Sequence, residues 1–387
     1  MVFRNVDSRL RVPIVAGLCA FVFHLIANPH YGFFRDELYF IICGRHPQWG
    51  YVDQPPITPL LAAASQLFGH SLFALRAVAA AFGGASVYVI CLLVLELGGG
   101  TFALTLAAVA GTLSPVLAAF AMKVGPDMVG LWLWPLAALY LLRIVHGASA
   151  RLWPAIGAAI GFSLESKYSV LYFAAAMIAG LLLTPERRIL RSKWFAGGVI
   201  VAVATALPNF LWQAFNGFPM WELLRNGQLG KNVILTPAMF LFAELLITNP
   251  LLSLVWIAGL IALFLNPRAR FLAYGYVILI VLMIASHAKH YYPADVYPIL
   301  FAAGGVAWES VTRNARLLRP VAIALALLAG LAMLPYVEPI LPEQTFIAFN
   351  QAVGPKIGAS AAVTEHSKQT WMSQDWSDMH GWPQLAD

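Results

Sequence analysis

The chain has 387 residues, of which 60% are hydrophobic and only 11% are charged, against roughly a quarter charged in an ordinary soluble domain. A water-soluble fold lacks the interior needed to hide so much apolar surface, so this class is excluded. Lys and Arg outnumber Asp and Glu by 24 to 18, but most basic residues lie in short gaps between apolar runs. That placement is typical of membrane proteins, and nucleic acid is therefore not an expected partner.

The N-terminal segment resembles a signal peptide, with Arg4, Arg9 and Arg11 ahead of an apolar run from Val12 to Ala27. It lacks a small-residue cleavage site before the next polar stretch. We interpret it as a retained first helix whose N-terminus is cytoplasmic.

Apolar runs follow one another along most of the chain, and crossing the hydrocarbon core takes about 20 helical residues. They cover residues 12–28, 72–96, 101–121, 128–143, 152–166, 168–184, 194–216, 237–265, 271–286, 293–311 and 320–336. The pattern predicts an all-α membrane protein, a polytopic bundle of about eleven transmembrane helices.

The stretch 152–184 is either one long tilted helix or two short ones that turn at Glu165, Ser166 and Lys167. Basic loops precede it, with Arg143 and Arg151, and follow it, from Arg187 to Lys193. Both ends should then be cytoplasmic, because short cytoplasmic loops collect Lys and Arg. The number of crossings must be even, so two helices are predicted.

Two segments are expected outside the membrane. The first outer loop, residues 28–71, is rich in aromatic and apolar residues, which favours short helices lying in the interface. The tail, residues 337–387, is more polar and contains several tryptophans. We divide the chain into a membrane module, 1–336, and this short tail, which resembles the start of a truncated outer domain.

Ionisable residues within a membrane are costly and are usually functional. Here they map to the first loop and to the outer ends of the helices, while the middle of the runs is nearly free of them. Transporters tend to bind their substrates near the bilayer midplane. The pattern therefore favours an interfacial enzyme over a transporter, for which Glu244 is nearly alone as a mid-depth candidate.

Several motifs carry a resemblance to a known class of enzyme. They are RDELYF (35–40), GYVDQPPITPLL (50–61), FGHSLFALR (68–76), KVGPDMVGLWLWPLAALYLL (123–142), SKYSVLYF (166–173), PNFLWQAFNGFPMW (208–221) and KHYYPADVYPILFAAG (289–304). In this order the chain resembles the GT-C class of membrane glycosyltransferases, in the group of protein O-mannosyltransferases and lipid A aminoarabinose transferases. The resemblance covers nearly all of residues 12–336.

The resemblance implies that the first-loop acids Asp36 and Glu37 lie at the catalytic centre and that the donor is a sugar on a polyprenyl phosphate. Aromatic neighbours are able to desolvate a carboxylate there and to raise its pKa toward that of a general base. Asp36 is the candidate base, Glu37 a supporting carboxylate, and Asp127 a third acid at the same site. The structural alternatives are an acid pair at a helix N-terminus and, for Asp127, a helix cap.

Cations at the outer helix ends are candidates to bind the donor phosphate, because departure of a lipid phosphate needs charge stabilisation more than a strong acid. The candidates are Arg76, Lys123, Lys167, Lys289 and His290. The structural alternatives are pairing with an acid for Arg76, and lysines that snorkel to the interface without a function. Asp53 and Gln54 are candidate sugar contacts, with a stiff turn before Pro55 as the structural alternative.

The expected activity is inverting transfer from a polyprenyl-phosphate-linked sugar to a lipid, glycan or protein acceptor at the periplasmic face of a bacterial inner membrane. No Asp-any-Asp motif is present at the site, and His24 and His70 have no partner at helical spacing, so we predict no metal and no cofactor. A transporter or flippase of polyprenyl-linked sugars is the alternative function. A scaffold or non-catalytic relative is a third hypothesis.

Overall fold

The computed structural model describes residues 8–230, 235–357, 372 and 374–382, and the described part is helical throughout, without strands. The α-helices are α1 Ser8–Ala27, α2 Arg35–Arg45, α3 Ile57–Gln66, α4 Leu72–Glu96, α5 Thr101–Leu113, α6 Pro115–Met122, α7 Asp127–Val145, α8 Trp153–Leu164, α9 Val170–Leu182, α10 Lys193–Phe215, α11 Pro219–Gly230, α12 Pro237–Ile247, α13 Pro250–Leu265, α14 Arg270–Ala285, α15 Tyr297–Val311, α16 Leu318–Met333, α17 Glu343–Ile357 and α18 Gln374–Ser377. Short 3-10 turns are η2 Ala150–Leu152, η3 Pro185–Arg191, η4 Ala294–Val296 and η5 Leu334–Tyr336.

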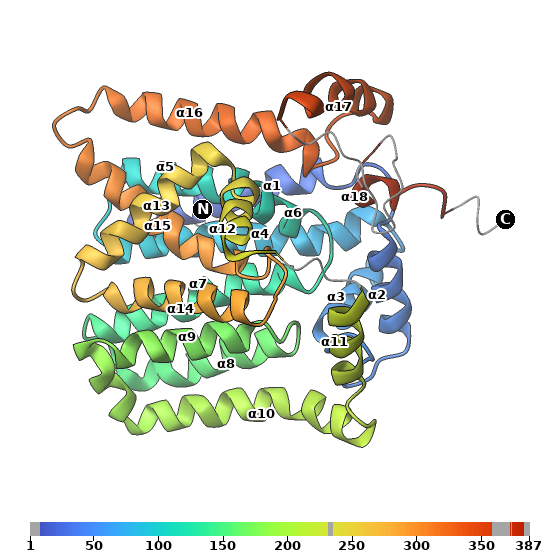
Figure 1. Ribbon diagram of the computed structural model, residues 1–387, viewed down its shortest axis with the longest axis horizontal. Helices are drawn as coiled ribbons and strands as arrows, with labels where there is room; N and C mark the ends of the chain where they lie inside the picture. Colours follow the sequence, from blue (N-terminus) through green and yellow to red (C-terminus); the bar gives the residue numbers. More distant parts are fainter. Residues whose placement is uncertain (1–7, 231–234, 358–371, 373, 383–387) are drawn as a thin grey trace.

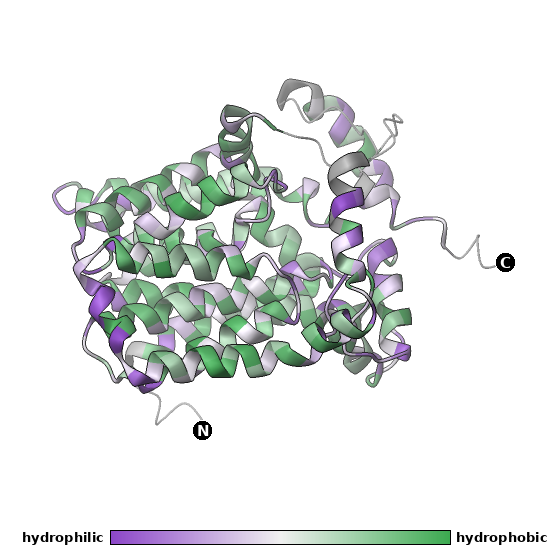
Figure 2. Cartoon of the chain, turned by 60° about the horizontal axis from the view of Figure 1, so that its bottom comes forward, coloured by the Kyte–Doolittle hydropathy of each residue, from purple (hydrophilic) through white to green (hydrophobic). Residues whose placement is uncertain are grey.

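The long helices run alongside one another in a bundle, while α2, α3, α11, α17 and α18 gather at one end of it (Figure 1). We call this the α2–α3 end. Hydrophobic residues fill the middle of the bundle, and hydrophilic residues concentrate toward its two ends (Figure 2). This distribution is the one expected of an integral membrane protein.

Within the described residues, five helices are long and apolar enough to cross a membrane, or up to eight if each bent pair is one span. Two shorter apolar helices, over Ala150–Leu164 and Arg270–Ala285, lie beside them. The helical membrane fold is thus confirmed, and the count of eleven stays a prediction. The predicted split of residues 152–184 is confirmed, because α8 and α9 are separate helices joined by a turn at 165–169.

Two of the predicted runs are broken. Residues 101–121 form α5 and α6, which meet at 61° across Ser114, and residues 237–265 form α12 and α13, which meet at 109°. At the second break Asn249 has φ of +75° and its side chain accepts a hydrogen bond from the Leu251 N–H. Asn tolerates such a backbone and caps the helix that follows it, so the bend is local in origin.

Small residues let the long helices approach closely. A Cβ built on Gly84 of α4 would lie 2.7 Å from the carbonyl oxygen of Gly17 in α1. Likewise, a Cβ on Gly259 of α13 would lie 2.1 Å from the carbonyl oxygen of Leu300 in α15. Helix pairs in membranes associate through close packing of this kind, since lipid offers no hydrophobic drive between helices.

Candidate active site

The predicted first outer loop folds into α2 and α3, and one buried ion pair joins it to the bundle. Glu37 of α2 is fully buried and Arg76 of α4 is 1% exposed. Arg76 Nη2 lies 2.9 Å from Glu37 Oε2, and Nε donates to both carboxylate oxygens. The Phe34 and Val124 N–H groups also donate to Glu37.

The remaining donors of Arg76 bind the chain between α1 and α2. Nη1 donates to the carbonyl oxygens of Asn28 and His30, and Nη2 donates to that of Gly32. All five N–H groups of the guanidinium therefore have partners inside the protein. This geometry favours the alternative left open for Arg76, pairing with an acid, and it gives Glu37 a role in holding the loop. Phosphate binding by Arg76 stays an untested prediction.

Asp36 lies in the first turn of α2 next to this pair, but its side chain is 52% exposed. Arg35 Nε lies 3.3 Å from Asp36 Oδ1. The two neighbouring acids of the loop thus have opposite environments, because the helix turns Glu37 inward and Asp36 outward. Asp36 is therefore the acid of the pair that faces the surroundings of the protein.

A second pair joins the start of α7 to the turn between α8 and α9. Lys167 donates to Asp127, and its ammonium lies 4.1 Å from the ring centre of Tyr292. Burial opposes the charged lysine, but the charges of Asp127, Tyr292 and Asp295 outweigh it and raise the pKa of Lys167. Lys167 is therefore held as a cation at this end of the bundle.

Tyr291 is a partly buried tyrosine near the Lys167 pair. Burial raises the pKa of its hydroxyl, and the charges of Asp127, Tyr292, Asp375 and Asp36 raise it further. Its ring packs edge-on against Phe120. Sequence reasoning missed Tyr291 as a site residue, although it stands in the quoted motif KHYYPADVYP.

Three of the predicted cations lie at the Tyr291 ring, and Lys123 lies at another. Lys289 and Lys167 lie 5.9 Å and 5.3 Å from the centre of Tyr291, and His290 packs edge-on against it. Burial, and next the charge of Lys289, lowers the pKa of His290, so the neutral imidazole is favoured there. Lys123 lies 3.8 Å from the ring centre of Phe34 and pairs with Asp375.

We call this group the outer polar cluster. Its members are Asp36, Lys123, Asp127, Lys167, Lys289, His290 and Tyr291. Asp295 lies behind it, 2% exposed, and the α7 turn reaches it only because residue 130 is glycine. Within the described chain no group of three His, Cys, Asp or Glu residues is arranged to hold a metal ion.

Asp53 and Gln54 have their contacts elsewhere. Asp53 accepts a hydrogen bond of 2.7 Å from the Tyr39 hydroxyl, and the Gln54 carbonyl accepts one from the Tyr51 N–H. The Gln54 side chain is 4% exposed. These contacts favour the turn that sequence analysis offered as the alternative, and sugar binding by these two residues stays a prediction.

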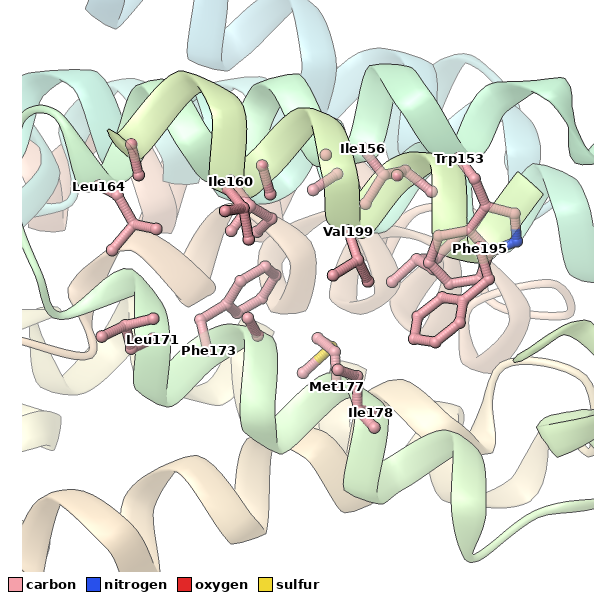
Figure 3. Close-up of a pocket in the computed structure, with 18 of the residues that line it drawn as sticks. Trp153, Ile156, Ile160, Leu164, Leu171, Phe173, Met177, Ile178, Phe195 and Val199 are labelled. Atoms are coloured by element: carbon pink, nitrogen blue, oxygen red, sulfur yellow. The ribbon is translucent and has the colours of Figure 1, made fainter. Parts of the chain in front are cut away.

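An apolar cavity of about 530 Å3 lies between α9 and α10, with α7 and α8 at its base. Leu164 and Leu171 lie toward one end of it, and Trp153 and Phe195 toward the other (Figure 3). Leu164 and Leu171 flank the turn that carries Lys167. The turn at this end of the cavity therefore carries one member of the outer polar cluster, Lys167.

The comparisons with known proteins agree with this architecture. A family model described as dolichyl-phosphate-mannose-protein mannosyltransferase matches residues 53–212, a range that contains Lys123, Asp127 and Lys167 but not Asp36. The crystal structure of ArnT from Cupriavidus metallidurans in the apo state is similar in fold, with a TM-score of 0.64 and 16% identity. The alignment covers 96% of this chain and 77% of that one. No curated protein matches the sequence.

Fold and cluster thus define a polytopic membrane protein with its polar groups collected at one end of the bundle. The chain has the fold of ArnT, and its residues 53–212 match the mannosyltransferase family model.

Proposed function

We propose that the protein transfers a sugar from a polyprenyl-phosphate carrier to a lipid, glycan or protein acceptor, at the periplasmic face of a bacterial inner membrane. The observation that carries the proposal is the turn between α8 and α9, which links the apolar cavity to the outer polar cluster. The turn carries Lys167 of the cluster, and the residues that flank it, Leu164 and Leu171, line the cavity. A donor with a long apolar tail and a phosphate head needs these two environments side by side.

The chemistry assigned to the cluster is nucleophilic displacement with inversion at the anomeric carbon. Asp36, the exposed acid, takes the proton of the acceptor hydroxyl as that oxygen bonds to the sugar. The bond between the sugar and the phosphate oxygen breaks on the opposite side, and the lipid phosphate departs as a stable anion. Lys123, Lys167 and Lys289 stabilise its negative charge.

Asp127 serves the same site indirectly, by fixing Lys167 through their ion pair. The Tyr291 hydroxyl stays protonated, because burial and the nearby acids raise its pKa. It is therefore available as a hydrogen-bond donor to the departing phosphate or to a sugar hydroxyl. No step of this scheme calls on a metal or an organic cofactor, and their absence from the reaction stays a prediction.

The test compares cells that express the wild-type protein with cells that express Asp36→Asn, with envelope lipids, glycans and glycoproteins analysed by mass spectrometry. We expect a sugar modification that is present with wild type and absent with the variant. Glu343→Gln, which removes a half-exposed acid of α17, is the matched control and should keep the modification. Persistence of the modification in Asp36→Asn cells would exclude this base.

A second assay addresses transport. Purified protein in liposomes receives a polyprenyl-phosphate sugar and a set of candidate acceptors. Transfer of the sugar supports the proposal, whereas movement of the carrier lipid across the bilayer without transfer would establish a flippase instead.

A further inference from the structure

The C-terminal segment, described at 372 and 374–382, packs over the outer polar cluster. Trp376 is 1% exposed and Met379 is 2% exposed. Both belong to an apolar cluster that also contains Phe34, Met122 and Phe346. The segment is thus anchored on Phe34, the residue before α2, and on Met122, the residue before Lys123.

The anchoring is close enough to depend on one glycine. A Cβ built on Gly32 would lie 2.0 Å from the carbonyl oxygen of Met379. The Met379 sulfur lies 3.7 Å from Nη2 of Arg76, and the Tyr31 ring packs edge-on against Trp376. The backbone of the segment is therefore fixed on the loop that Arg76 holds.

From this fixed backbone two carboxylates reach the cations of the site. Asp375 pairs with Lys123, and Asp378 Oδ2 lies 3.0 Å from Nη1 of Arg35. Asp375 is 61% exposed while Lys123 is 20% exposed, so the acid is the partner that solvent reaches more easily. The charge of Asp375 also raises the pKa of the Tyr291 hydroxyl.

We propose that Asp375 is an internal competitor for phosphate, which occupies Lys123 when no donor is bound and gives way to the donor phosphate. The inference rests on the proposed function, since it assigns Lys123 to the donor phosphate. An exposed ion pair contributes little to stability. The donor phosphate is a diester with the same single charge as a carboxylate, and the apolar chain of the donor adds contacts that Asp375 does not have. Trp376 and Met379 are buried and hold the segment, whereas the Asp375 carboxylate is exposed. The carboxylate is therefore able to leave Lys123 while the segment stays in place.

Binding of farnesyl phosphate to the full chain in nanodiscs tests the proposal. Asp375→Asn should bind it about two- to fivefold more tightly than wild type, the range expected for loss of one exposed competing pair. Lys123→Gln should bind it more weakly. In the double variant Lys123→Gln/Asp375→Asn the gain should vanish, because the contested cation is gone.

Glu343→Gln removes an acid from the same tail without touching Lys123 and should leave the affinity at the wild-type value. A gain that persists without Lys123, or an equal gain in Glu343→Gln, would reduce the effect to general charge and overturn the proposal. Unchanged or weaker binding by Asp375→Asn would overturn it as well.

The two proposals fail in different ways. If wild type and all variants fail to bind farnesyl phosphate, the polyprenyl-phosphate donor is excluded and the competition falls with it. If wild type binds farnesyl phosphate and Asp375→Asn binds it no better, only the competition is excluded.

Discussion

Arg76 and Glu37 form a buried ion pair, with 2.9 Å between Nη2 and Oε2, that ties the first outer loop to α4. The rest of the site depends on this tie, since the same guanidinium holds the carbonyl groups of Asn28, His30 and Gly32. The pair thus places Asp36 and the surface on which the C-terminal segment rests.

Breaking the pair should destabilise the protein strongly. Arg76→Met or Glu37→Leu alone leaves a buried charge without its partner, and each should lower the free energy of unfolding by about 3–5 kcal/mol. The double variant should lose less than the sum, because no lone charge remains. Denaturation in mixed micelles measures the effect, with exposed Arg225→Met on α11 as the control. Additive losses would show that the two residues do not act as a pair.

The turn between α8 and α9 should make stability depend on pH. Burial raises the pKa of Glu165 from 4.5 to about 7, so the folded protein holds a proton there that the unfolded chain releases. The contribution is complete below pH 4.5 and is lost as the pH rises to about 7. Glu165→Gln should remove this decline from a series of melting temperatures between pH 4.5 and 7. A decline of equal size in the variant would assign it to another group.

The apolar cavity should discriminate between carrier lengths. Val199, halfway along the cavity (Figure 3), lies 11 residues from Phe210 on α10, which is about 16 Å along a helix. Val199→Trp should therefore weaken binding of undecaprenyl phosphate at least tenfold, while farnesyl phosphate, with its shorter chain, binds nearly as before. Val281→Trp, on the exposed face of α14, is the matched control. Equal binding of both lipids by Val199→Trp would place the chain elsewhere.

Substitution of Glu244 tests whether its carboxyl belongs to a transport pathway or stabilises the fold. It is 1% exposed, it accepts a hydrogen bond from the Tyr297 hydroxyl, and that ring packs against Trp256. Glu244→Gln keeps an acceptor for the hydroxyl, so we expect unchanged transfer and stability. Glu244→Leu leaves the hydroxyl without this acceptor and should cost about 1–3 kcal/mol of unfolding free energy. Loss of lipid movement in Glu244→Gln liposomes would instead favour transport.

The long apolar segments could be predicted well from the sequence because hydrophobicity alone sets them. The run 72–96 coincides with α4, and the charged flanks of 152–184 correctly gave two helices. The breaks at Ser114 and Asn249 could not be found this way, since hydropathy averages over a single capping residue. The charge pattern likewise did not predict α17, which follows the last predicted span.

The polar residues of the site could be found, but their partners could not. Asp36, Lys123, Asp127 and Lys167 stand in separate segments, and their contacts with Phe34, Tyr291 and one another are set by tertiary packing. The sequence alone does not distinguish the adjacent acids Asp36 and Glu37. The orientation of α2 in the fold exposes Asp36 and buries Glu37. The carboxylate of Asp375 lies 252 residues from its lysine, beyond the reach of any local pattern.

The close approach at Gly32 means that this residue controls where the C-terminal segment lies. A methyl group at this position would lie 2.0 Å from the Met379 carbonyl oxygen. At this distance one of the two backbones must shift. Gly32→Ala would therefore displace the C-terminal segment from Lys123 and Arg35, while every charged residue of the site is retained. This substitution changes the position of the segment without changing its charge. Substitution of Asp375 removes the charge and the contact with Lys123 together.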